Sequence, residues 1–134
     1  MTHCWRRVYA DCRLIIVIRQ TFGKKILQNA EELLRTSLWG QSLTADEMSR
    51  ALAGTCERAY AAGAFICMKG DPVDSWMGII DGLGKMASHW TTGKTTSLTG
   101  ISAGGWFGEG SLLKEEPRRY DVMALRETRV AFMN

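Results

Sequence analysis

The chain has 134 residues, of which 46% are hydrophobic and 23% charged, and its formal net charge is +3. This length suits one domain that can bury a core without cross-links. No apolar run approaches the ~20 residues of a membrane span, and the longest, residues 14–18, is too short for a secretory signal core. These features argue against membrane insertion, and we expect a cytoplasmic protein.

The charges are unevenly distributed along the chain. Residues 1–30 hold six Lys/Arg and one acid (+5), whereas residues 31–134 hold eleven Lys/Arg and thirteen acids (−2). We therefore expect a basic N-terminal extension of unknown role at 1–30 and one domain at 31–134. The extension could be an arm attracted to nucleic acid or an anionic surface, but a solvated segment is the favoured interpretation.

The cysteines and histidines are too scattered to suggest a metal or catalytic centre. They are Cys4, Cys12, Cys56, Cys67, His3 and His89. No C-x-x-C pair or zinc spacing occurs, and Cys67 stands in an apolar run typical of a buried strand. Because no Ser-His-acid or Cys-His arrangement is visible either, we predict no metal site and no enzyme.

Residues 29–53 show the apolar spacing of two short helices. The apolar positions are Leu33, Leu34 and Leu38, then Leu43, Met48 and Leu52. Thr44 and Glu47 form a capping-box pattern at the start of the second helix, and Leu43 with Met48 matches a hydrophobic staple.

From about residue 57, short β-favouring runs alternate with turns that contain glycine. Predicted strands cover 75–81, 85–90 and 95–101, with breaks at 82–84 and 91–94. Such spacing is typical of a sandwich, barrel or jelly roll. Within the first of these strands, both alternating sets are largely apolar, which predicts a strand covered on both faces.

The loop after residue 103 gathers glycines, one acid and two arginines. Its glycines leave the backbone open to a ligand, and a short helical turn at 109–113 would direct free N–H groups at an anion. Arg118 or Arg119 could bind a phosphate bidentately, and Glu109 could accept hydrogen bonds from sugar hydroxyls. The alternative is a solvated loop in which the arginines pair with Glu115 and Glu116.

Four short motifs resemble one known family. FGExxLL at 107–113 and PRxxxVxA at 117–124 look like the phosphate-binding cassette of the cyclic nucleotide-binding domain; GxFIxxxGD at 63–71 and IDG at 80–82 are similar to its first strands. Together they cover roughly residues 35–133 and are typical of N-terminal sensor domains of Crp/Fnr-type bacterial transcription regulators. The resemblance implies a mainly β fold, a double-stranded β-helix or jelly roll (β-roll) with short N-terminal α-helices.

The resemblance also implies a set of ligand-binding residues. Glu109 would accept from the ribose 2′-hydroxyl, Arg118 would bind the cyclic phosphate, and backbone N–H groups near Gly110 and Ser111 would add contacts. The candidate ligand-binding residues are Gly108, Glu109, Gly110, Ser111, Arg118 and Arg119. Alternation along the following strand would turn Arg118 inward and Arg119 to the other face. Arg119 and Tyr120 depart from the small residues that nucleotide binders of this family usually carry there.

The function implied is effector sensing in a transcription regulator, with cAMP or cGMP as a possible effector and no other cofactor. The alternative is a degenerate roll that binds no nucleotide and serves protein interaction or assembly. The cysteine spacing does not resemble an iron–sulfur site. A homodimer is expected for the full-length regulator, and DNA binding only through a helix-turn-helix that this sequence does not contain.

Overall fold

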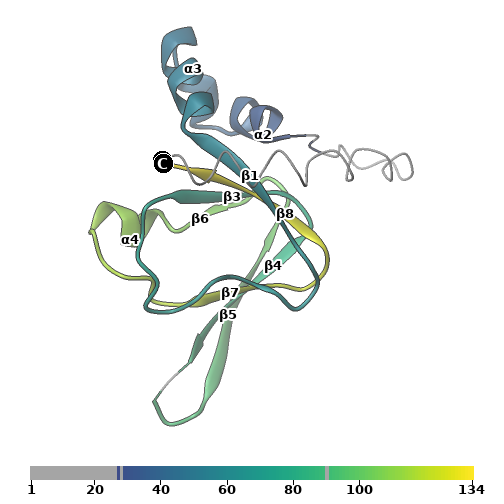
Figure 1. The fold of residues 1–134 in the computed structure, drawn as a ribbon, viewed down its shortest axis with the longest axis vertical. Helices are drawn as coiled ribbons and strands as arrows, with labels where there is room; N and C mark the ends of the chain where they lie inside the picture. Colours follow the sequence, from purple (N-terminus) through teal and green to yellow (C-terminus); the bar gives the residue numbers. More distant parts are fainter. Residues whose placement is uncertain (1–26, 28, 90) are drawn as a thin grey trace.

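The computed structural model describes residues 27, 29–89 and 91–134, so most of the predicted basic extension lies outside the described residues. Short helices come first and strands follow (Figure 1). The elements are α2 (Ala30–Thr36), η1 (Gly40–Ser42), α3 (Ala45–Ala53), β1 (Thr55–Tyr60), β2 (Phe65–Cys67), β3 (Trp76–Asp81), β4 (Leu83–His89), β5 (Thr95–Ser102), β6 (Trp106–Phe107), α4 (Glu109–Leu113), β7 (Asp121–Ala124) and β8 (Thr128–Met133).

The strands form two four-stranded antiparallel sheets, in the orders β1-β8-β3-β6 and β2-β7-β4-β5. Most neighbours in a sheet are distant in sequence, since β8 lies between β1 and β3, and β7 between β2 and β4. The exception is the β4–β5 hairpin, which extends away from the rest of its sheet (Figure 1). The chain therefore winds from one sheet to the other, and its first and last strands pair.

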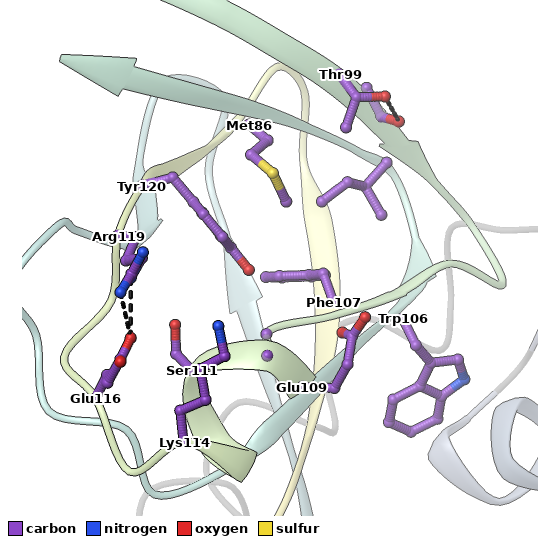
Figure 2. A pocket seen from close by; sticks show the side chains of 14 residues that line it. Met86, Thr99, Trp106, Phe107, Glu109, Ser111, Lys114, Glu116, Arg119 and Tyr120 are labelled. Carbon is purple, nitrogen blue, oxygen red and sulfur yellow. Dashed lines mark hydrogen bonds and ion pairs between the residues drawn. The ribbon is translucent and has the colours of Figure 1, made fainter.

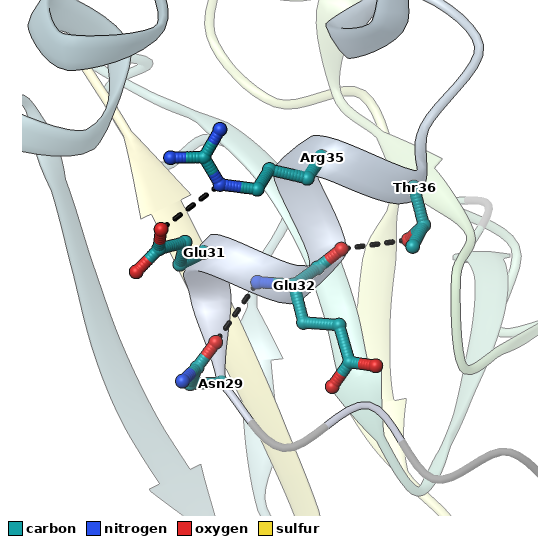
Figure 3. A network of polar contacts seen from close by, with 5 residues as sticks. All are labelled: Asn29, Glu31, Glu32, Arg35 and Thr36. Atoms are coloured by element: carbon teal, nitrogen blue, oxygen red, sulfur yellow. Dashed lines mark hydrogen bonds and ion pairs between the residues drawn. The ribbon is translucent and has the colours of Figure 1, made fainter.

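The two predicted helices are present, and their caps explain where they begin. The Asn29 side chain accepts from the Glu32 N–H at 2.8 Å and starts α2 (Figure 3). The predicted capping box starts α3, because Thr44 and Glu47 exchange side chain–backbone bonds. The prediction that Leu38 belongs to the apolar face of the first helix is wrong: α2 ends at Thr36, and Leu38 is 89% exposed.

Strand β3 is covered on both faces, as its sequence predicted. Met77 and Ile79 join the core cluster between the two sheets, whereas Ile80 packs with Leu33 of α2 on the other side. On that helical side Gly78 leaves no space for a side chain, because an added Cβ would lie 2.8 Å from Leu33. Helix α2 thus covers this part of the outer face of the first sheet.

The turns follow the glycines, with one difference from the predicted boundaries. The predicted break at 82–84 shrinks to Gly82, whose φ of 112° lies in the left-handed region, and β4 begins at Leu83. An added Cβ on Gly82 would collide with Thr128, so the tight turn brings β4 against β8. Among the described residues, no helix has the length and apolarity to cross a lipid bilayer.

Candidate ligand-binding site

A pocket of about 540 Å³ opens between the second sheet and the segment from β6 to β7 (Figure 2). Its volume is in the range of small-molecule sites. The lining residues are Met86, Thr99, Gly100, Ile101, Trp106, Phe107, Gly108, Glu109, Gly110, Ser111, Lys114, Glu116, Arg119 and Tyr120. Apolar side chains from the strands form one part of the wall, and polar groups of α4 and the loop after it form the other.

Gly108 is the turning point between β6 and α4. Its φ of 90° is left-handed, and its carbonyl accepts from the Leu112 N–H at 3.3 Å to start the predicted helical turn. An added Cβ would collide with the Arg118 guanidinium. Glycine is therefore required here both by backbone conformation and by the close approach of that arginine. The turn leaves Glu109 exposed and Ser111 buried.

Arg118 is only 4% exposed, and it is fixed through both side chain and backbone. Its Nη1 donates to the Gly108 carbonyl at 3.1 Å and its Nη2 to the Ser75 carbonyl at 2.7 Å. Its backbone exchanges bonds with the 70–71 turn: Gly70 N–H donates to Arg118 O at 2.8 Å, and Arg118 N–H to Asp71 O at 2.9 Å. Within the described part of the chain, no carboxylate forms an ion pair with it.

Arg119 has a different environment. Its Nη2 lies 2.7 Å from Glu116 Oε2, and its side chain is 68% exposed. The solvated-loop interpretation therefore holds for Arg119 but not for Arg118. Both arginines precede β7, so their different hydrogen-bond partners, rather than alternation along a strand, separate their environments.

Most of the predicted ligand-binding residues meet at the pocket. Gly108, Glu109, Gly110, Ser111 and Arg119 line it. Arg118 is not a lining residue, but it bonds to one of them, Gly108.

The sequence prediction did not include several other lining residues. Lys114, Thr99 and Met86 carry no motif signal. Tyr120 departs from the small residues of the family pattern, and that departure alone does not predict a place in the pocket.

Tyr120 is half-buried, and its ring packs against the core cluster between the sheets. Burial raises the pKa of its phenol; the Arg118 charge lowers this pKa in part, and the Glu109 charge raises it. The phenol therefore lies within the electrostatic reach of both charged residues and stays protonated at neutral pH. Burial also raises the pKa of the Cys67 thiol to about 11, so this free cysteine is an unreactive core residue, as expected from its apolar run.

These features define a two-sheet β domain with a pocket bordered by a glycine turn and a buried arginine. The family model of the cyclic nucleotide-binding domain matches residues 57–134, more than half of the chain, and the chain belongs to this family. No curated protein sequence is similar enough to count as a match. The predicted mainly β roll with N-terminal helices is thereby confirmed. Domains of this family are in general regulatory and non-catalytic.

Three solved structures illustrate the shared fold. The regulatory domain of Toxoplasma gondii protein kinase A with cAMP is 22% identical, with a TM-score of 0.72 over 78% of this chain and 40% of that one. The Thermus thermophilus catabolite activator protein is 25% identical, with a TM-score of 0.62 over 75% and 45%. The sensor domain of the Pseudomonas aeruginosa transcriptional regulator DNR is 17% identical, with a TM-score of 0.71 over 77% and 69%. The chain thus spans less than half of the first two proteins.

Proposed function

We propose that this chain is the effector-sensing domain of a Crp/Fnr-type transcription regulator and binds a small phosphorylated ligand, such as cAMP, in the pocket beside Gly108. Membership of the cyclic nucleotide-binding domain family supports the ligand class. The motif resemblance supports the regulator type, whereas the structural neighbours include both transcription regulators and kinase regulatory subunits.

The buried guanidinium of Arg118 is the observation that carries this proposal. A guanidinium stays charged at all accessible pH values, and burying a charge is costly unless a counter-charge or strong hydrogen bonds compensate. Arg118 has two backbone carbonyls as acceptors and, among the described residues, no carboxylate. Two of its five N–H donors are engaged by these bonds, and a phosphate at the pocket edge would supply the missing negative charge.

The other predicted residues have supporting roles in this proposal. Glu109 lines the pocket and is exposed, so its carboxylate is free to accept hydrogen bonds from the ribose 2′-hydroxyl. Gly110 and Ser111 lie beside it in α4, where their backbone N–H groups would add contacts to the phosphate. Arg119 lines the pocket and would give a weak cationic contact, because it must first leave Glu116.

The alternative function is that of a degenerate roll serving only interaction or assembly. The observation that favours it is that Arg118 does not line the pocket, while its guanidinium already bonds to the Gly108 and Ser75 carbonyls. Calorimetric titration with cAMP and cGMP separates the two. We expect saturable heat for at least one nucleotide; no heat at concentrations up to millimolar would favour the degenerate roll.

Partners of the whole regulator are also part of the proposal. We infer that a regulator of this type acts as a homodimer and contacts DNA through a separate helix-turn-helix. The described sheets offer no comparable element, and residues 31–134 carry a net charge of −2, which opposes attraction to phosphates. We therefore expect residues 31–134 alone to give no footprint on operator DNA.

A further inference from the structure

Tyr120 lines the pocket and carries a hydroxyl group. Figure 2 shows its ring extending from the segment before β7 towards the start of α4, with the hydroxyl end facing that turn. The ring contacts the core between the sheets, so the side chain is held at its base. The position of the hydroxyl is therefore set by packing rather than by solvent.

The groups around the phenol oxygen leave its proton available. The Gly108 backbone amide lies on the side of the oxygen and lowers the pKa of the phenol in part. A phenol has one O–H donor besides its acceptor sites. Among the residues that the structure describes, no acceptor takes this proton. The hydroxyl is therefore available to a ligand in the pocket that Tyr120 lines.

Arg118 and Tyr120 occupy complementary places around Gly108. The Arg118 guanidinium bonds to the Gly108 carbonyl and does not line the cavity, whereas the Tyr120 side chain does line it, together with Gly108. The phenol is also close enough to Arg118 to feel its charge. An anion drawn towards the buried cation would therefore meet the tyrosine hydroxyl at the cavity surface.

We propose that Tyr120 is a ligand-binding residue that donates a hydrogen bond to the anionic group of the ligand, beside the Arg118 charge. This inference rests on the proposed function, because it names a contact in the same pocket. A bond from a phenol to a phosphate oxygen is charge-assisted and stronger than a neutral pair. It would add selectivity for the charged nucleotide over the uncharged nucleoside.

The test compares the wild type with Tyr120→Phe, which keeps the ring in the core and removes only the hydroxyl. Calorimetric titrations would use cAMP and, as the uncharged probe, adenosine. We expect Tyr120→Phe to weaken cAMP binding about tenfold and to leave any adenosine binding unchanged. Tyr60→Phe is the matched control, because Tyr60 also packs against the same core but does not line the pocket.

The outcomes separate this inference from the proposed function. Equal cAMP affinity in the wild type and Tyr120→Phe would overturn the role of Tyr120 and leave the proposed function intact. Stronger cAMP binding by Tyr120→Phe would also overturn it, because the hydroxyl would then obstruct the ligand. Absence of cyclic nucleotide binding in the wild type would overturn both. Thermal unfolding of each variant checks that the fold is retained.

Discussion

The guanidinium of Arg118 lies directly against Gly108, donating to its carbonyl at 3.1 Å and leaving no space for a side chain on its α-carbon. This contact joins two segments that are ten residues apart and fixes the pocket wall between them. Arg118 can take this position only because residue 108 is a glycine.

Gly108→Ala should destabilise the domain for two reasons. Alanine would have to adopt the left-handed φ of residue 108, and its methyl group would collide with Arg118. We expect a loss of about 1–3 kcal/mol in unfolding free energy and weaker ligand binding. Gly110→Ala is the matched control: an added Cβ there meets nothing within 4 Å, and alanine favours a helix. Thermal denaturation should separate the two, and equal melting temperatures would show that Gly108 is not constrained.

Thr44→Ala should remove the N-terminal cap of α3. The Thr44 hydroxyl accepts from the Glu47 N–H at 3.3 Å, and Glu47 bonds back to the Thr44 N–H at 2.8 Å. We expect a loss of about 1 kcal/mol, measured by urea unfolding. Ser49→Ala, at an exposed position inside the same helix, should be neutral or slightly stabilising. A similar loss in both variants would argue against the cap.

The free energy of unfolding should decrease at alkaline pH. Burial raises the pKa of Cys67 from 9.0 to about 11 and also raises those of Tyr60 and Tyr120. Because the unfolded chain loses these protons first, the Cys67 contribution is fully present below pH 9 and is lost as pH rises towards 11. Cys67→Ala should have a shallower decline in unfolding free energy over this window. An unchanged slope would mean that the thiol is not shielded in the folded state.

Glu109→Gln should weaken cAMP binding less than about fivefold, since the amide oxygen can still accept from the 2′-hydroxyl. Glu109→Ala removes the acceptor and should cost more. With 2′-deoxy-cAMP, which lacks the hydroxyl, Glu109→Gln and Glu109→Ala should bind alike. A tenfold difference between them for the deoxy ligand would show that Glu109 acts elsewhere on the ligand.

Much of the fold followed from local sequence signals. The capping box at Thr44, the two-faced strand at 76–81 and the helical turn at 109–113 depend on residues close in sequence, which is why they were predictable. The exposure of Leu38 could not be predicted in this way, because the spacing of apolar residues does not mark where α2 ends. The end depends on the Ser37 side chain, which bonds to the Leu34 carbonyl at 2.7 Å.

The site was predictable in outline but not in its contacts. The motifs indicated Glu109 and the arginines, yet the partners of Arg118 include the Ser75 carbonyl, which is 43 residues away in sequence. Pairing between strands distant in sequence brings these segments together, and no local pattern encodes it. The same holds for Tyr120, whose place in the pocket depends on packing against the core.

We expect Arg118, rather than Arg119, to supply the main charge for a phosphorylated ligand. The direct measurement is cAMP affinity, by calorimetry, for the wild type, Arg118→Ala and Arg119→Ala, with the exposed, similarly ion-paired Arg35 changed to alanine as control. We expect a loss of roughly tenfold to 150-fold for Arg118→Ala, a smaller one for Arg119→Ala and none for Arg35→Ala. Equal losses for the first two variants, or none in either, would contradict it.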